Sequence, residues 1–326
     1  MEIASQSSRT GFFVRASADE AMLRRFVANT MASKEIAVAT ATVSRTERTF
    51  VDAEGVTIHY YTWPAKKPKG VLQLAHGLGE YATRYEGVAQ ALATAGYSVY
   101  ADDHRGHGRT GVEQHLGDMK RMGRLGPGGL RATIEEVRQL TTIIRSENEG
   151  LPLAILGHSW GSLMVQIILN QHAGDYEAAI LTGTAYRRPG SMNAGQLNAK
   201  HKHLGTTGYE WLSRDPAVSQ AFLDDPLTFY ADVLKLFGLA DGLRLFGVPT
   251  KHVEKDIPLL IAIGSEDPLG GEKSVHTLAE KYISRSRLTD VEVIIYADAR
   301  HEIYNELNKD EAIADLVAWL DARFAS

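Results

Sequence analysis

Leu151 to Asn170 read LPLAILGHSWGSLMVQIILN, in which a short apolar run, a Gly-x-Ser-x-Gly turn and a longer apolar run follow one another directly. The first run suits a buried strand, and the second has the length of a helix. The turn between them must be very tight, and it needs glycine at 157 and 161 because neighbouring backbone leaves no room for a β-carbon. Such a turn holds the hydroxyl of Ser159 out on a sharp corner, so we take Ser159 as a candidate nucleophile.

A serine hydroxyl at neutral pH needs partners before it can act as a nucleophile. It requires a base within hydrogen-bond reach and an acid that orients that base. The bare Gly-x-Ser-x-Gly pattern fixes only three positions, so chance matches occur, and the case for Ser159 depends on these partners. In a parallel sheet they are expected in loops at the carboxyl ends of strands, where Ser159 also lies.

Two later apolar runs end in loops of this kind. Gly264-Ser-Glu-Asp-Pro268 follows one of them, and Ala297-Asp-Ala-Arg-His-Glu302 follows the other. The chain order Ser159, Asp267, His301 is the order expected of this strand–turn–helix architecture. Rival acids are Glu266, Asp290 and Asp298. Rival bases are His104, His107 and His158, which we expect to shape the loops beside the serine, while His276 falls inside a predicted helix.

Acyl transfer also requires hydrogen-bond donors aimed at the developing oxyanion. One candidate is the backbone N–H of Trp160, directly after the serine. The other should come from the loop after the first parallel strand, where Gly77 and Gly79 flank Leu78. We therefore predict the backbone N–H groups of Leu78 and Trp160 as the two donors.

Strands alternating with helices on both sides of the Gly-x-Ser-x-Gly turn predict an α/β fold, with a mostly parallel central sheet and helices on both faces. The expected parallel strands are 70–75, 97–101, 151–156, 176–183, 257–263 and 291–296. The expected helices include 85–94, 130–146 and 309–324. Thr49–Val51 and Val56–Trp63 are predicted as a hairpin of antiparallel edge strands, and Gly111–Gly129 as an irregular segment.

The rhythm of strands and helices divides the chain into three parts. Residues 46–183 and 256–326 form the predicted core, and 184–255 form an inserted cap of short helices broken by glycine and proline. Residues 1–45 show no strand alternation and are interpreted as a peripheral arm, with helical spacing from Glu20 to Ala32. The cap carries eight aromatic residues, most of which we expect to pack its own core: Tyr186, Tyr209, Trp211, Phe222, Phe229, Tyr230, Phe237 and Phe246.

Composition excludes several function classes. The 326 residues carry a net charge of −5 with mixed signs, which argues against a nucleic-acid partner. The chain has no cysteine, so disulfides, thiolate catalysis and cysteine-bound metals are excluded, and we expect no metal or cofactor. No run of about 18 apolar residues predicts a membrane span, and the first residues do not read as a signal peptide. By default we expect a cytoplasmic protein.

These motifs together resemble the α/β-hydrolase superfamily, within it the branch of monoacylglycerol lipases, lysophospholipases and related serine esterases. The resemblance covers residues 45–326. It rests on His76-Gly-Leu-Gly-Glu80, Asp103-His-Arg-Gly-His-Gly108, Gly157-His-Ser-Trp-Gly161, Gly264-Ser-Glu-Asp-Pro268 and the His301 loop. It implies a triad of Ser159, Asp267 and His301, oxyanion donors at Leu78 and Trp160, and a lid over an acyl pocket. Trp160 and Ser162 depart from the methionine and glycine common in the family, and the large indole is expected to narrow the acyl site.

The leading hypothesis is a hydrolase that cleaves carboxylic esters, such as monoacylglycerols or lysophospholipids with short to medium acyl chains, through an acyl-enzyme. One alternative is an aminopeptidase of the proline iminopeptidase type, which would need cap acids for the substrate ammonium. Its candidates are Asp215, Asp224, Asp225 and Asp232. The other alternative is a ligand-binding protein that keeps the fold without turnover.

For an ester or lipid substrate we expect contacts from both core and cap. The predicted contact residues are His76, Gly77, Trp160, Tyr186, Trp211 and Phe237. The apolar run 233–239 has two readings: it offers a lid face to a lipid surface for transient contact, or it packs its helices onto the mouth of the pocket.

Overall fold

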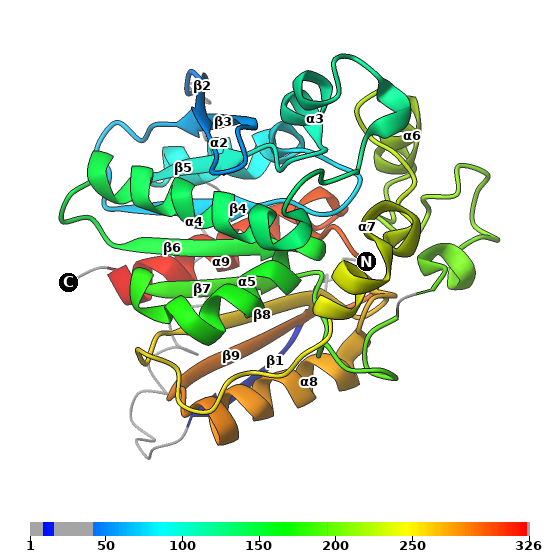
Figure 1. The fold of residues 1–326 in the computed structure, drawn as a ribbon. Helices are drawn as coiled ribbons and strands as arrows, with labels where there is room; N and C mark the ends of the chain where they lie inside the picture. Colours follow the sequence, from blue (N-terminus) through cyan, green and yellow to red (C-terminus); the bar gives the residue numbers. More distant parts are fainter. Residues whose placement is uncertain (1–8, 16–41, 194, 325–326) are drawn as a thin grey trace.

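The central feature of the computed structural model, which describes residues 9–15, 42–193 and 195–324, is a single sheet with helices on both faces (Figure 1). Within the described residues the sheet has nine strands, in the order β1-β9-β8-β7-β6-β4-β5-β3-β2. The strands are β1 (Arg9–Arg15), β2 (Thr46–Val51), β3 (Thr57–Trp63), β4 (Gly70–Ala75), β5 (Tyr97–Asp102), β6 (Leu153–His158), β7 (Ala178–Thr182), β8 (Leu259–Gly264) and β9 (Asp290–Tyr296). This is the α/β-hydrolase architecture predicted from the sequence.

The middle of the sheet is parallel and its two margins are antiparallel. Strands β5, β4, β6, β7, β8 and β9 pair in parallel, while β3 and β2 at one margin and β1 at the other run antiparallel to their neighbours. Strands β4 to β8 are buried along their whole length, as continuous apolar runs in parallel sheets should be. The parallel strands bring their carboxyl ends, and the loops that follow them, to one edge of the molecule.

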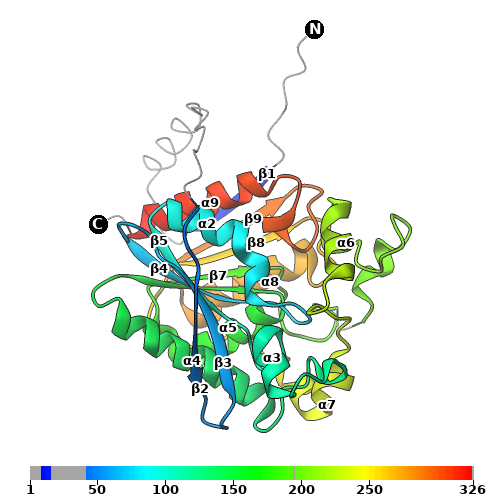
Figure 2. The ribbon, with the colours of Figure 1, turned by 90° about the horizontal axis from the view of Figure 1, so that it is seen from above.

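Two groups of helices cover the faces of the sheet (Figure 2). One apolar core lies under α2 (Glu86–Thr94) and α9 (Lys309–Phe324). The other lies under α4 (Gly129–Glu147), α5 (Trp160–His172) and α8 (Gly271–Lys281). Helix α4 forms because Leu130, Val137, Leu140 and Ile144 recur on one face, and all four are buried.

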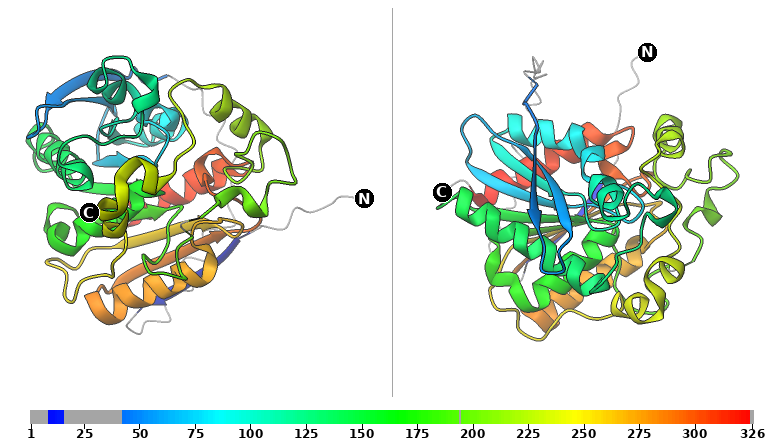
Figure 3. Two further views of the ribbon diagram at one scale, coloured as in Figure 1. Left: turned by 45° about the vertical axis from the view of Figure 1, so that its right-hand side comes forward. Right: turned by 45° about the horizontal axis from the view of Figure 1, so that its top comes forward.

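The segment between β7 and β8, which the sequence predicts to be an inserted cap, lies at one end of the sheet (Figure 3). Its helices are α6 (Pro216–Asp224) and α7 (Val233–Arg244), each started by an aspartate that accepts a backbone N–H. Asp215 caps α6 ahead of Pro216, and Asp232 caps α7. Helix α7 is kinked at Gly238, where φ is +74°.

Three details differ from the sequence-based expectations. Arg9–Arg15, expected to lie in an arm without strands, forms β1 and pairs with β9 over seven residue pairs. The hairpin has only one edge strand, β2, because β3 also pairs with β5. Helix α3 (Gly108–Gln114) extends into the segment 111–129 that was expected to be irregular, and its glycines at 108 and 111 made a helix hard to predict there. The helical spacing from Glu20 to Ala32 lies outside the described residues.

Short turns of 3-10 or π-helix join the main elements. They are Ala82–Tyr85, Met119–Arg121, Ala173–Asp175, Leu197–Lys200, Tyr282–Ser286 and Ile303–Asn305. Two of them matter for the site, because Ala82–Tyr85 follows the loop after β4 and Ile303–Asn305 follows the loop after β9.

Candidate active site

Ser159 lies on a strained turn between β6 and α5. Its backbone angles are φ +52° and ψ −122°, which is rare for a residue with a side chain. A β-carbon at 161 would lie 2.1 Å from the carbonyl oxygen of Ala75, and one at 157 would lie 2.6 Å from that of Gly161. The predicted need for glycine at both positions is therefore confirmed. The turn places a half-exposed serine at the amino end of α5.

Behind the serine lies a buried histidine–aspartate pair. The Nδ1–H of His301 donates to Oδ1 of Asp267 across 2.9 Å, and the backbone N–H of Leu269 donates to the same oxygen at 2.9 Å. His301 and Asp267 are almost fully buried, at 1% and 4% exposure. The His301 ring centroid is 4.7 Å from that of His158, which immediately precedes the serine. Nε2 of His301 has no partner among the described residues, so it is the ring nitrogen free to take a proton.

Electrostatics favour a basic imidazole at 301. Burial alone would lower the pKa of His301, but the charge of Asp267 and its hydrogen bond outweigh burial, so this pKa is raised above 6.5. By contrast, burial and the neighbouring His301 hold the pKa of His158 well below 6.5. His158 is thus held neutral, with Nδ1 hydrogen-bonded to Thr182 at 3.0 Å.

The rival acids are engaged elsewhere. Glu266 pairs with Lys200 at the surface, and Asp290 pairs with Arg323 at 2.8 Å. Asp298 is exposed and sits in a turn where its N–H donates to Ser265. Of the four acids that the sequence left open, Asp267 is the one that holds His301.

The loop after β4 lies against the serine, and its geometry is set from both sides. A β-carbon on Gly77 would be 3.1 Å from Cβ of Ser159. The carbonyl oxygen of Gly77 accepts from Nδ1 of His76 at 2.7 Å. The backbone N–H of Gly77 donates to Glu80 at 2.6 Å. Because a trans peptide is planar with C=O and N–H on opposite sides, fixing this carbonyl turns the Leu78 N–H the other way. Trp160 supplies a second free N–H as the first residue of α5.

His76 differs from its predicted role as a substrate contact. It is fully buried, and its Nε2 accepts the backbone N–H of His104 at 3.0 Å while Nδ1 holds the Gly77 carbonyl. Its ring stacks on His104 at 4.0 Å. The His76 side chain therefore shapes the loop, because both of its ring nitrogens are hydrogen-bonded to backbone groups.

The predicted aromatic contacts divide into two groups. The ring of Trp211 lies 4.7 Å from that of His301, and the ring of Phe237 in α7 lies 5.2 Å from that of Trp160. Tyr186 instead packs against the core that includes α8, and its N–H donates to Ser274. Because Tyr186 lies against α8 at this point, its ring contributes to core packing.

Phe229 is a cap residue near the site that sequence reasoning did not single out. Its N–H donates to the carbonyl of Gly79 at 3.1 Å, and its ring lies 5.2 Å from that of His107. The cap backbone therefore sits directly on the loop that carries Leu78. No local pattern marks Phe229 among the cap aromatics, because its partners are about 120 to 150 positions away in the sequence.

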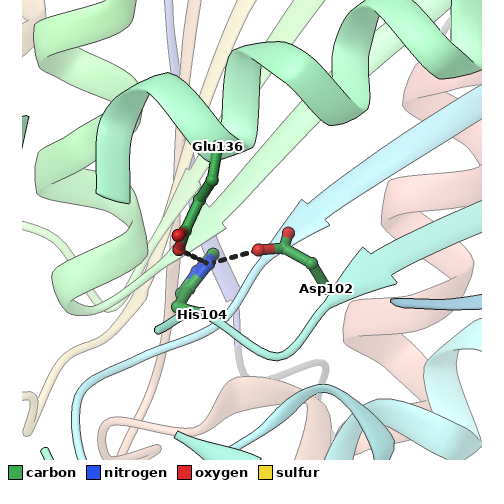
Figure 4. A group of neighbouring side chains, drawn as sticks. All are labelled: Asp102, His104 and Glu136. Carbon is green, nitrogen blue, oxygen red and sulfur yellow. Dashed lines mark hydrogen bonds and ion pairs between the residues drawn. The ribbon is translucent and has the colours of Figure 1, made fainter. Parts of the chain in front are cut away.

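Asp102, His104 and Glu136 form the group of described residues whose ligand atoms could converge on a metal ion (Figure 4). His104 lies between the other two, with Nδ1 2.7 Å from Asp102 and 3.8 Å from Glu136. However, the Arg105 backbone N–H and Nε already donate to the two oxygens of Glu136, at 3.0 and 3.1 Å. A cation would have to displace this guanidinium, so we interpret the group as an internal ion-pair cluster.

The chain is similar to known proteins in both sequence and fold. Residues 66–308 match the family described as serine aminopeptidase, S33. The chain is 32% identical to a monoacylglycerol lipase of Mycolicibacterium smegmatis, covering 85% of this chain and 97% of that protein. It is 25% identical to human monoglyceride lipase, covering 85% and 90%. The crystal structure of a carboxyl esterase from Bacillus coagulans has the same fold, with a TM-score of 0.72, 22% identity and coverage of 87% and 100%.

Proposed function

Because the chain belongs to the serine aminopeptidase S33 family of α/β-hydrolases, we propose that this carboxylic ester hydrolase cleaves monoacylglycerols, lysophospholipids or similar esters with Ser159 as its nucleophile. The observation that carries the proposal is the buried pair of His301 and Asp267 beside the strained turn of Ser159, with His301 Nε2 left free. The names of the two lipase relatives support the choice of substrate class.

In this mechanism His301 takes the hydroxyl proton of Ser159 as the serine attacks the ester carbonyl. Asp267 holds the imidazole in the tautomer with Nδ1 protonated and stabilises the imidazolium that forms. The N–H groups of Leu78 and Trp160 stabilise the tetrahedral oxyanion, and His301 returns its proton to the departing alcohol. Water activated by the same histidine then releases the acid from Ser159.

An apolar cluster beside the serine suits an acyl chain. It contains Trp160 and Leu163 of α5 together with Leu245 of the cap, and further residues pack against it: Leu78, Met192, Val233 and Phe237. The Trp160 indole is 3% exposed and sits between His107 and Phe237, at 5.3 and 5.2 Å. We infer that this ring limits the depth available to the acyl chain, which favours short to medium chains.

The aminopeptidase alternative gains no support from the cap acids. Asp215 and Asp232 accept backbone N–H groups at the starts of α6 and α7. Asp225 accepts from the Tyr81 hydroxyl and from the Leu227 N–H, and Asp224 accepts from Gln220. Each of the four carboxylates already has a structural partner, whereas recognition of a substrate ammonium needs a charge turned toward the serine.

Replacing Ser159 with alanine tests the proposal. Turnover of a nitrophenyl ester series and of a monoacylglycerol should fall by about 10⁶, the loss found when such a nucleophile is removed. Ser146→Ala is the control, since this serine lies on the exposed face of α4 and bonds only within its helix. Hydrolysis of proline arylamides at rates above those of the esters would instead support the aminopeptidase, and near-normal ester turnover by Ser159→Ala would rule out the assigned nucleophile.

We further propose transient contact of the cap with a lipid surface. Six of its apolar side chains are exposed by about half or more: Leu204, Leu223, Tyr230, Leu234, Leu239 and Leu243. No helix in the described part of the chain combines the length and apolar character needed to cross a bilayer. Contact would therefore be peripheral. The cytoplasmic location remains a prediction from the sequence.

Vesicle flotation with a double variant, Leu239→Asp with Leu243→Asp, tests this contact. Phe237 is unsuitable for the purpose, because it packs on Trp160 and its change would disturb the site. We expect wild-type protein to float with anionic vesicles and the double variant to stay in solution, while both hydrolyse a soluble nitrophenyl ester equally. Equal flotation of the two proteins would show that this face does not bind lipid.

A further inference from the structure

A buried ion-pair network lies behind the candidate site and joins two loops that are distant in sequence. Nη1 of Arg84 lies 2.6 Å from Glu80 and 2.9 Å from Glu302, and Nη2 donates to the second oxygen of Glu302 at 3.0 Å. The three side chains are 12%, 5% and 5% exposed. Arg84 and Glu302 are 218 positions apart in the sequence. The guanidinium also packs over the ring of Phe222 in α6 of the cap, 4.7 Å from its centroid.

Each end of the network touches a loop that the proposed mechanism uses. Oε1 of Glu80 accepts the N–H of Gly77 at 2.6 Å, in the loop whose next residue is the donor Leu78. The same oxygen accepts from the Tyr85 hydroxyl at 2.7 Å. At the other end, Glu302 directly follows His301 and is held by Asn305 at 2.8 Å. Arg84 therefore spans from the oxyanion loop to the loop of the general base.

Pairing within the network opposes the loss of charge that burial favours. Burial disfavours the charge on Arg84, but Glu302 and Glu80 more than compensate, and the pKa of Arg84 is raised. Burial raises the pKa of Glu80, and Arg84 opposes that rise. A buried bridge of this kind contributes little net stability, because desolvation cancels most of the attraction. The bridge instead fixes the relative positions of the groups that it joins, since a bidentate arginine–carboxylate pair has few alternative arrangements.

We propose that Arg84, through Glu80 and Glu302, is a positioning residue that holds the Leu78 donor and the His301 base at the separation required for acyl transfer. The inference rests on the proposed function of Ser159 and His301, and it assigns Arg84 no contact with substrate. Loss of the bridge lets the two loops move independently. A displacement of about 1 Å at reacting groups can cost about 10² in rate, so kcat should fall while KM changes little.

The network also adds negative charge near His301. The charged groups that act on its imidazole are Asp267, Glu302 and Glu80, while Arg84 is paired with the two glutamates. The neighbouring His158 is held neutral. Against the effect of burial, Asp267 contributes most to the raised pKa of His301, and Glu302 and Glu80 raise it further. Removing the charge of Glu302 should therefore move the acidic limb of the rate profile to lower pH.

The test compares Arg84→Met, Glu302→Gln and their double variant with Glu306→Gln. Glu306 is the comparison for the base loop alone, because it is buried, pairs with Arg214 at 2.8 Å and accepts the backbone N–H of Arg300 at 2.8 Å, whereas the Arg84 bridge also reaches the oxyanion loop. We expect Arg84→Met to lower kcat on a soluble nitrophenyl ester by about 10–10² with KM within about threefold. Glu302→Gln should lower kcat and shift the acidic limb downward. The double variant should be no worse than Arg84→Met, because residues of one bridge do not act additively.

Thermal unfolding of each variant separates positioning from folding. Glu306→Gln should lower Tm while leaving the pH profile unchanged. If Arg84→Met does not fold, the isosteric Glu302→Gln decides by its kcat and pH profile alone. Folded variants with wild-type kcat and an unmoved profile would overturn the inference. Labelling of wild-type Ser159 by a fluorophosphonate reports on the proposed function separately, since absence of labelling would reject the nucleophile whatever the Arg84 variants do.

Discussion

His301 is buried and yet more basic than a free histidine, and this combination makes a prediction about pH. Burial lowers its pKa, the charge and hydrogen bond of Asp267 outweigh that effect, and the result lies above 6.5. The neutral imidazole is the form that accepts the Ser159 proton. Consequently kcat/KM should be low in acid and rise as pH increases through a midpoint above 6.5. Initial rates between about pH 5 and 9 on a nitrophenyl ester would locate that midpoint.

Asp267→Asn gives the companion experiment at the same residue pair. The variant removes the charge of Asp267 that raises the pKa of His301, while the burial that lowers this pKa remains. The midpoint of the rate profile should therefore move to lower pH. The rate at neutral pH should fall by about 10⁴, because an amide favours the wrong tautomer of His301. Glu266→Gln, one position earlier and paired with Lys200 at the surface, serves as the control and should match the wild type. A midpoint unchanged by Asp267→Asn would mean that another group titrates.

The proposed triad could be predicted from sequence because three local patterns occur in a fixed order, each after a predicted strand. Ser159 and His301 needed no knowledge of distant contacts, whereas the preference for Asp267 over Glu266 is supported by its hydrogen bond to His301. Arg84 and Glu302 could not be found this way, since their roles depend on a contact across 218 positions. The hydrogen bonds of His76 could not be predicted for a related reason: its Nε2 partner, His104, belongs to a different loop.

Helix α5 begins where neighbouring backbone leaves no space, and this gives a prediction for its second residue. A β-carbon at Gly161 would lie 2.1 Å from the Ala75 oxygen, which is backbone and cannot move aside cheaply. Gly161→Ala should therefore destabilise the fold by at least about 1–3 kcal/mol and displace Ser159. Thermal unfolding and ester turnover would both report the change.

The second residue of α2 provides the matched control for Gly161. Gly87 is exposed, and a β-carbon there meets nothing within 4 Å. Gly87→Ala should therefore stabilise the protein by about 0.4–1 kcal/mol, since alanine reduces the entropy of the unfolded chain. Equal changes in stability for the two variants would contradict the steric argument, because crowding at residue 161 predicts destabilisation there alone.

Helices and strands whose apolar residues recur at regular spacing could be predicted from the sequence, and those without such spacing could not. Helix α9 occupies Lys309–Phe324 as predicted, because its apolar residues recur at helical spacing over 16 residues. Strand β1 was not predicted because Arg9–Arg15 lacks alternation and pairs with β9, 275 to 287 positions away. Its position in the sheet is a property of tertiary pairing, which local propensity does not reveal.

At the scale of the whole molecule, β1 closes one margin of the sheet, and its removal should separate folding from catalysis. A chain of residues 42–326 would leave the outer edge of β9 unpaired along Asp290–Tyr296. Strand β9 keeps its parallel pairing with β8, and Ser159, Asp267 and Leu78 lie on segments that β1 does not pair with. We therefore expect kcat per folded molecule within about twofold of the full chain, because the reacting groups keep their supports.

The exposed edge should instead lower solution stability, since an unpaired strand is a template for pairing with another chain. Light scattering against protein concentration should show association of the 42–326 chain, together with a lower Tm. A chain that lacks only residues 1–8 retains β1 and should behave as the full chain does. Wild-type Tm and scattering for the 42–326 chain would mean that β1 adds nothing to the sheet. Lost turnover in a folded 42–326 chain would instead place β1 in support of the His301 loop, because Arg9 pairs with Tyr296 just before that loop begins.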